Sequence, residues 1–331
     1  MGLNMKVETA LGNVDCANSR EPMLSIVTPF YDEAGSVEGY FKALRETLDR
    51  IESVTYEIVC VNDGSRDSTL EVLSEYARHD ARIVVVDLSR NFGKEAALTA
   101  GIDVARGAAV IPFDADLQDP PEVIPDLVRR WRDGAEMVVA RRLDRSADSW
   151  TKRTSAEAFY RFHNMISDRK IPENVGDFRL MDRVVVDAIR RLPERQRFMK
   201  GLFAWVGFDT AVVDYSRPAR TAGGSKFSPW KLWNLALEGL TSFSTAPLRV
   251  WTYIGSAVSL LAFLYGLTIV GFVLVKGRDV PGYASILVAV LMLGGIQLIG
   301  IGVLGEYIGR IYAEAKQRPV YLIRSIIRSG S

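Results

Sequence analysis

The chain has 331 residues, of which 48% are hydrophobic, and its formal net charge is +1. This length admits one large domain or two modest ones, and so high an apolar fraction predicts that the apolar excess is concentrated in one part of the chain. A net charge near zero provides no general attraction for nucleic acid. We therefore expect no nucleic-acid partner, and a local basic cluster wherever an anion binds.

The cysteines and the N-terminal residues indicate a cytosolic domain. Cys16 stands in a polar leader and Cys60 in an apolar run, a pairing that argues against a disulfide and suits a reducing compartment. Residues 1–21 lack the apolar core of a signal peptide. We expect them to form a disordered leader, followed by a domain that stays in the cytoplasm.

Apolar runs of strand length alternate with segments of helical periodicity across residues 22–216. Strands that are apolar on both faces and alternate with helices are typical of an α/β domain whose mostly parallel sheet is covered on both sides. Ligands of such sheets bind at the carboxyl ends of the strands. Polar clusters follow the first four predicted strands, so we expect them to line one crevice. The predicted strands are residues 24–30, 57–61, 82–88, 108–113 and 137–140.

Two carboxylates, Asp114 and Asp116, follow the fourth strand directly. Residues i and i+2 of an extended chain point to the same side, so both can face one Mg²⁺ or Mn²⁺ ion. A lone Asp-x-Asp is more often a polar turn than a metal site, but the position at a strand end beside three other polar clusters favours the metal site. A calcium loop starting at Asp114 is excluded, because its sixth and twelfth positions hold Asp119 and Pro125 in place of Gly and Glu.

Two common nucleotide-binding motifs are missing from the sequence. No G-x-G-x-x-G follows the first predicted strand, and no G-x-x-x-x-G-K-[ST] occurs anywhere. The dehydrogenase and P-loop classes therefore lose their main support.

A basic, flexible stretch separates this domain from the apolar part of the chain. Residues 217–233 combine four cations with small residues and two tryptophans. A solvated linker is one explanation, but Trp and Lys together at the edge of an apolar segment are typical of interfacial membrane anchors. We therefore expect residues 217–249 to form a juxtamembrane segment on a lipid bilayer.

Two uncharged segments, residues 250–275 and 283–305, are each long enough to cross a hydrocarbon core of about 30 Å. They predict a hairpin of two transmembrane helices within residues 250–312. Cations flank both outer ends, which predicts a multi-pass membrane protein with the α/β domain and a tail of residues 313–331 in the cytoplasm. Glycines of the second span permit close helix contact within the hairpin or in a homo-oligomer; they are Gly302, Gly305 and Gly309.

Five motifs in this arrangement resemble the polyprenyl-phosphate glycosyltransferases of the GT-A type, in glycosyltransferase family 2. The motifs are TPFYDE (28–33), VNDGS (61–65), SRNFGK (89–94), DADLQDP (114–120) and GDFRL (176–180). The resemblance is nearest to the GtrB-like bactoprenol glucosyltransferases and more distant to dolichol-phosphate mannose synthase. It implies a Rossmann-like GT-A domain that transfers a hexose, with inversion, from a nucleotide-sugar donor to a polyprenyl-phosphate acceptor such as undecaprenyl phosphate.

The resemblance also assigns roles on the donor side. Lys94 would reach a donor phosphate or the base, and Asp63 would bond the base. A divalent ion, Mg²⁺ or Mn²⁺, would neutralise the diphosphate as a leaving group. The residues implied for the ion are Asp114, Asp116 and Gln118, and those implied to frame the nucleoside are Pro29, Tyr31 and Glu33.

On the acceptor side, the lipid phosphate is largely dianionic at pH 7 and needs little help from a base. Asp177 is the residue that the resemblance offers as a base; alternatively it orients a sugar hydroxyl, with Arg179 balancing charge in the donor site. Arg197 and Lys200 are candidates for the donor diphosphate, with a surface role as the alternative. Cations must gather around the acceptor phosphate. The available set at the membrane surface is Arg217, Arg220, Ser225 and Lys226.

Several alternatives stay open. UDP-glucose is the first choice of donor, with GDP-mannose or an aminoarabinose-type donor behind it. A processive polysaccharide synthase would carry a Q-x-x-R-W motif and more spans, whereas residues 196–200 read QRFMK. A catalytically inactive, membrane-bound sugar-nucleotide sensor or assembly factor is the alternative from another class.

Overall fold

The computed structural model describes residues 23–143, 175–195, 197, 199–216, 246–276 and 282–329. The predicted leader, most of the juxtamembrane segment and the connector between the predicted spans lie outside these ranges.

Within the described ranges, one eight-stranded sheet has the order β7-β5-β6-β4-β1-β2-β3-β8. Neighbours among β4, β1, β2 and β3 are parallel, as are β5 and β7, whereas β6 and β8 run antiparallel to the strands they pair with. The predicted mostly parallel sheet is thus confirmed. The strands are β1 (Leu24–Phe30), β2 (Tyr56–Asn62), β3 (Ile83–Leu88), β4 (Ala109–Pro112), β5 (Met137–Arg142), β6 (Val175–Asp182), β7 (Thr210–Tyr215) and β8 (Ile323–Ile327).

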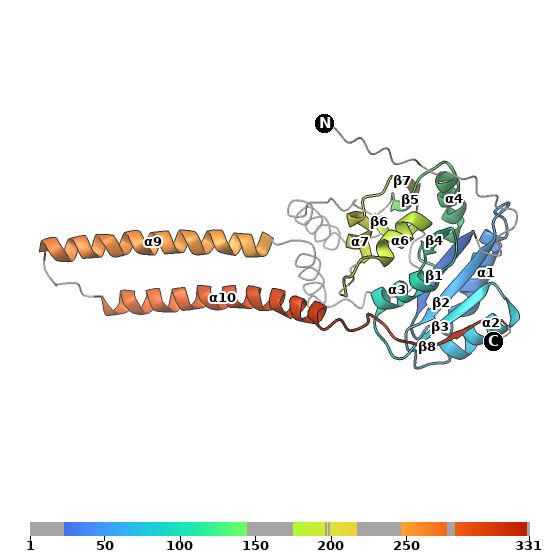
Figure 1. The fold of residues 1–331 in the computed structure, drawn as a ribbon, viewed down its shortest axis with the longest axis horizontal. Helices are drawn as coiled ribbons and strands as arrows, with labels where there is room; N and C mark the ends of the chain where they lie inside the picture. The colour runs from blue at the N-terminus through green and yellow to red at the C-terminus, as the bar shows by residue number, and fades with distance from the viewer. Residues whose placement is uncertain are drawn as a thin grey trace, which may run out of the picture.

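Helices cover both faces of the sheet, and every residue of β2 is consequently buried (Figure 1). One core lies under α1, α2 and α4, and the other lies under α3, α6 and α7. The buried positions of α1 follow the helical spacing seen in the sequence, with Val37, Tyr40, Phe41 and Leu44 facing the sheet side. The helices are α1 (Val37–Leu48), α2 (Thr69–His79), α3 (Lys94–Val104), α4 (Ile124–Arg132), α6 (Arg183–Arg190) and α7 (Met199–Trp205).

The apolar part of the chain forms a hairpin of two long helices, α9 (Ala246–Lys276) and α10 (Tyr283–Ala315), which project away from the sheet domain (Figure 1). Their apolar side chains are largely exposed, as expected where lipid replaces water. By length and composition, Val250–Phe272 and Met292–Ala315 qualify as membrane spans among the described residues. At 33 residues, α10 is about 50 Å long, which exceeds the thickness of a hydrocarbon core of about 30 Å.

Gly300 of α10 lies against the indole of Trp251 on α9. A Cβ at position 300 would collide with that ring, so a residue without a side chain is needed there. A Cβ at Gly302, Gly305 or Gly309 would meet nothing within 4 Å in the described structure. The close contact within the hairpin therefore uses a different glycine from the three singled out in the sequence.

The last strand of the sheet comes from the end of the chain, beyond the hairpin. β8 pairs antiparallel with β3, with Ile327 opposite Val85 and Ile326 opposite Val86. The sequence predicts only a tail for residues 313–331. The strand is missed because five residues carry little periodic signal and because their partner lies far earlier in the chain.

Candidate active site

Lys94 lies between two carboxylates at one edge of the sheet. It is the first residue of α3 after β3, Asp114 follows β4, and Asp177 lies at the start of the antiparallel β6. The Lys94 Nζ is 2.7 Å from Asp114 Oδ1 and 3.3 Å from Asp177 Oδ2. Residues from three separate motifs therefore meet at one point, as expected at the carboxyl edge of a parallel sheet.

This ion-pair cluster keeps Lys94 and Asp177 charged. Burial alone would lower the pKa of Lys94, but Asp114 and Asp177 outweigh it and raise that pKa above its ordinary value. Burial alone would raise the pKa of Asp177, but nearby cations, led by Lys200 and Lys94, lower it below the ordinary value. For Asp114 burial outweighs the pairing with Lys94 and raises the pKa.

Asp116 and Gln118 lie on the loop that follows β4. The Gln118 side-chain amide donates a hydrogen bond to Asp116 Oδ2, and the Gln118 backbone N–H donates to Oδ1 at 3.2 Å. Leu117 between them has a φ of 50°, which a residue with a side chain rarely adopts. The turn brings the two polar side chains together on the exposed side of the loop.

These oxygen donors suit a Mg²⁺ or Mn²⁺ site that the substrate completes. The carboxylates of Asp114 and Asp116 and the amide oxygen of Gln118 are hard ligands of the kind these ions prefer. Across the part of the chain that the structure describes, no three His, Cys, Asp or Glu side chains converge as a metal site. Mg²⁺ is commonly held by one or two carboxylates together with substrate phosphates, so a third protein carboxylate is not required.

Asp119, the third carboxylate of the same motif, has a structural contact. Its Oδ1 accepts a hydrogen bond of 2.6 Å from the Tyr215 hydroxyl of β7 and lies 3.8 Å from Arg142 of β5. These contacts tie the loop after β4 to the far edge of the sheet.

Asp63, which is predicted to bond the base, holds the loop that carries Lys94. Its Oδ1 accepts the N–H of Phe92 at 2.7 Å, and its Oδ2 accepts the N–H of Gly93 at 2.9 Å. Burial raises the pKa of Asp63, although these two amides oppose that rise. Gly64 next to it has a φ of 63°, and a Cβ there would collide with the backbone of Arg90 and Asn91. The two loops therefore pack backbone to backbone.

Pro29, Tyr31 and Glu33 lie at and just beyond the end of β1. The Tyr31 side chain is exposed, so its ring is available to a ligand. The Glu33 N–H donates to the Thr69 hydroxyl at 2.9 Å, and its carboxylate accepts from Ser36 at 2.9 Å. The loop after β1 is thus fixed against the start of α2, beside the loop that begins with Asp63.

Arg179 lies two residues after Asp177 on β6 and is buried. Its guanidinium donates to the Gly176 carbonyl at 2.7 Å and stacks over the Phe203 ring, 4.1 Å from the centroid. Burial lowers the pKa of Arg179 to about 10, an effect that Asp177 opposes. In this position Arg179 supports the backbone around Asp177, and its contact with the donor stays a prediction.

The remaining predicted cations divide into two groups. Lys200 on α7 lies close enough to lower the pKa of Asp177, whereas Arg197 donates to the backbone carbonyls of Leu192 and Glu194. The residues predicted for the lipid phosphate lie outside the described ranges; they are Arg217, Arg220, Ser225 and Lys226.

The structure adds Glu95 to the site. Its carboxylate accepts the N–H of Met199 at 3.2 Å, which ties the start of α3 to α7. Burial, followed by the charge of Asp177, raises the pKa of Glu95 to about 7. The sequence carries no signal for this role, since an acidic residue in the first turn of a helix is common for electrostatic reasons alone.

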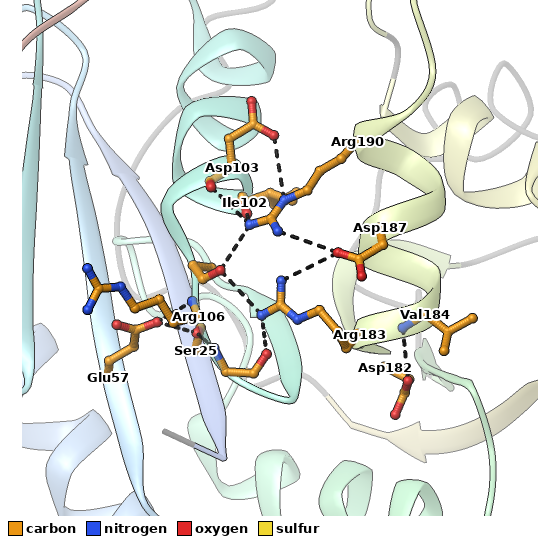
Figure 2. A network of polar contacts seen from close by, with 12 residues as sticks. Ser25, Glu57, Ile102, Asp103, Arg106, Asp182, Arg183, Val184, Asp187 and Arg190 are labelled. Carbon is orange, nitrogen blue, oxygen red and sulfur yellow. Dashed lines mark hydrogen bonds and ion pairs between the residues drawn. The ribbon is translucent and has the colours of Figure 1, made fainter. Parts of the chain in front are cut away.

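Two arginines of α6 fix the other end of α3 (Figure 2). Arg190 donates to the carbonyls of Asp103 and Ala105, both at 2.9 Å, and Arg183 donates to the carbonyls of Ala105 and Gly107. Cations at the carbonyl end of a helix compensate its unpaired acceptors and its dipole. With Asp63 holding Phe92 and Gly93, the two residues that precede it, α3 is anchored at both ends, and this determines where Lys94 lies.

Two families match successive parts of this chain. The family described as Glycosyl transferase family 2 matches residues 25–190, and the GtrB C-terminal hairpin matches residues 246–311. The first match contains β1 to β6 and most of the candidate site, and the second contains nearly all of α9 and α10.

Individual relatives extend the likeness over nearly the whole chain. A bactoprenol glucosyl transferase of Shigella phage SfV is 56% identical over 302 residues, which cover 91% of this chain and 98% of the relative. A prophage bactoprenol glucosyl transferase homolog of Escherichia coli is 54% identical over 92% of this chain and 99% of the relative. An uncharacterised glycosyltransferase of Synechocystis is also 54% identical, over 92% of this chain and 95% of the relative. The chain therefore belongs to glycosyl transferase family 2, as the resemblance of its motifs implied.

Proposed function

We propose that this protein transfers glucose from a nucleotide sugar to a polyprenyl phosphate at the cytoplasmic face of the inner membrane. UDP-glucose is the first candidate for the donor. The observation that carries the proposal is the meeting of Lys94, Asp114 and Asp177 at one sheet edge, in a chain that ends in the GtrB-type hairpin. The relatives described as bactoprenol glucosyl transferases support glucose and a polyprenyl acceptor.

On the donor side, the protein has to bind a diphosphate and let it leave. A divalent ion held by Asp114, Asp116 and Gln118 would neutralise the charge that develops on the departing nucleoside diphosphate. Lys94 adds a fixed positive charge at the same point, and the raised pKa keeps it protonated at neutral pH. Tyr31, just beyond the end of β1, is exposed and would cover the nucleoside.

On the acceptor side, the lipid phosphate is the nucleophile and attacks the anomeric carbon of the sugar in a single displacement with inversion. Because its second pKa is near 6, it is largely dianionic at pH 7 and has no proton that must be removed. The lowered pKa of Asp177 makes that carboxylate a weak base. We therefore assign Asp177 to orienting a sugar hydroxyl, held in place by the backbone contacts of Arg179.

The membrane end of the chain would deliver the acceptor. The hairpin of α9 and α10 anchors the protein, and the basic residues predicted around the phosphate are Arg217, Arg220, Ser225 and Lys226. The positive charges of these basic side chains would reduce the repulsion between the acceptor phosphate and the donor diphosphate.

The test is transfer by the purified full chain in lipid nanodiscs. Radiolabelled UDP-glucose, Mg²⁺ and undecaprenyl phosphate are mixed with the protein, and label extracted into the organic phase is counted. Parallel reactions with GDP-mannose, UDP-galactose and UDP-N-acetylglucosamine identify the donor. Bound nucleotide without transfer from any donor would favour the inactive-sensor alternative over the enzyme.

A further inference from the structure

The chain beyond the second membrane helix returns to the sheet domain and contacts it at several points. Glu314, near the end of α10, accepts the N–H of Arg195 at 2.8 Å. Tyr321 donates its hydroxyl hydrogen to Asp103, at the end of α3, at 2.7 Å. The Leu322 carbonyl accepts the N–H of Ser89 at 2.9 Å, and β8 then pairs with β3. Residues 314–327 therefore form a strap between the hairpin and the sheet.

Arg324 of this strap makes the contact nearest to the donor side. Its guanidinium lies 3.2 Å from Asp87 Oδ2 and donates to the Ser89 carbonyl at 2.7 Å. Asp87 is only 1% exposed, and its other oxygen accepts a hydrogen bond of 2.7 Å from Asn62. A carboxylate buried to this degree needs such partners, because an unpaired charge in the interior is costly.

Asn62 and Ser89, the partners of Asp87 and Arg324, each lie next to a loop of the candidate site. Asn62 precedes Asp63, whose carboxylate holds the amides of Phe92 and Gly93. Ser89 begins the loop that ends at Lys94. Its carbonyl accepts a hydrogen bond from Arg324, and its N–H donates one to the Leu322 carbonyl. Residues 89–94 are thus held from one side by Asp63 and from the other by the strap.

We propose that Arg324 is a positioning residue for the nucleotide donor, acting through the loop of residues 89–94. The proposal rests on the proposed function, since it takes a nucleotide sugar to be the ligand of that loop. Arg324 does not touch the reacting groups. Its bidentate geometry joins the Asp87 carboxylate to the Ser89 carbonyl, a pair that a single ammonium cannot hold in the same way.

The experiment compares Arg324→Gln, Arg324→Lys and the double variant Arg324→Gln/Asp87→Asn with wild type in nanodiscs. The double variant removes the buried charge that the single variant leaves unpaired, so it separates lost stability from lost positioning. Arg78→Gln on α2 is the control, since it breaks only an exposed ion pair with Glu75. UDP binding by calorimetry and the KM for each substrate are measured, together with Tm.

Positioning predicts that Arg324→Gln raises the Kd for UDP and the donor KM about tenfold, the loss expected for one charge-assisted hydrogen bond. The acceptor KM stays unchanged, and Arg324→Lys recovers part of the affinity. In the double variant Tm returns toward wild type while the donor KM remains raised. An unchanged Kd for UDP in Arg324→Gln would overturn the inference. So would a double variant in which both the donor KM and Tm return to their wild-type values. Absence of transfer in wild type would count against the proposed function instead, because UDP binding reports on the loop independently.

Discussion

Lys94 reaches both oxygens of Asp114, with its Nζ 2.7 Å from Oδ1 and 2.9 Å from Oδ2. The charge of this carboxylate is therefore compensated within the protein. An ion held by the same carboxylate has to compete with the ammonium, or the ammonium has to move toward the phosphates of the donor. In the proposed function Lys94 would thus link the binding of the ion to the binding of the donor.

Replacing Lys94 by Gln should separate these two events. The variant is expected to bind Mn²⁺ more tightly than wild type in the absence of donor, because the competing cation is gone, yet to transfer sugar at least about 100-fold more slowly. Mn²⁺ titration followed by electron paramagnetic resonance, and the transfer assay, measure the two effects. Lys42→Gln, on the exposed face of α1, is the control. Weaker Mn²⁺ binding in Lys94→Gln would argue against competition.

Asp116→Ala should abolish transfer while leaving membrane insertion intact. The carboxylate lies on the exposed loop after β4, so its loss removes an ion ligand without opening the core. Transfer is measured over a range of Mg²⁺ concentrations, and chelation by EDTA should mimic the variant in wild type. Asp119→Asn is the matched comparison and should lower Tm rather than change the Mg²⁺ dependence, since its carboxylate binds Tyr215. Substantial activity of Asp116→Ala at saturating Mg²⁺ would contradict the metal role.

Glu95 makes the stability of the domain depend on pH. Its pKa rises from the ordinary 4.5 to about 7 in the folded protein, so the unfolded chain loses this proton first as pH rises. Folding is thus disfavoured increasingly between about pH 4.5 and pH 7, and the penalty is constant above that range. Glu95→Gln should raise Tm relative to wild type at pH 8 and leave it unchanged at pH 4.5. An equal shift in Tm at both pH values would contradict the titration.

Arg179→Met should lower both stability and activity, because Met keeps much of the volume but cannot donate to the Gly176 carbonyl. The loss of a buried, charge-assisted hydrogen bond is expected to cost about 2 kcal/mol. The rate should fall as well, because the backbone at Asp177 loses its support. Thermal unfolding and kcat are the measurements, with Arg179→Lys as the conservative comparison. A variant with normal Tm and a raised donor KM would instead favour the direct donor contact predicted from the sequence.

Gly300→Ala should weaken the packing of the hairpin, because its Cβ would collide with the Trp251 indole. Gly302→Ala is the matched control, since a Cβ there meets nothing within 4 Å in the described structure. Tm in nanodiscs should fall for the first variant and stay unchanged for the second. Adding Trp251→Ala to Gly300→Ala should remove the collision and restore part of the Tm. Equal effects of the two glycine variants would show that the cause lies outside this contact.

The general position of the site is predictable from the sequence, but the orientation of individual side chains is not. Parallel strands bring their carboxyl ends to one edge, so polar clusters after β3 and β4 suffice to place Lys94 near Asp114. Asp63 also lies near that edge, yet its carboxylate turns to the backbone amides of Phe92 and Gly93, 29 and 30 positions later. Arg179 stacks on the ring of Phe203 on α7, a second contact that no local pattern in the sequence reveals. The contact between Arg324 and Asp87 spans 237 positions, beyond the reach of any periodic signal.

The position of β8 in the chain affects how the sheet forms during synthesis of the protein. Because β8 follows α9 and α10 in the chain, the edge of β3 with which it pairs stays unpaired until both helices of the hairpin have been synthesised. An unpaired strand edge is a site for wrong pairing, so the interval before the C-terminus arrives is the period when the nascent domain is most exposed to aggregation. The support that this last segment gives to Ser89, through the Leu322 carbonyl, therefore forms only after the hairpin has been synthesised.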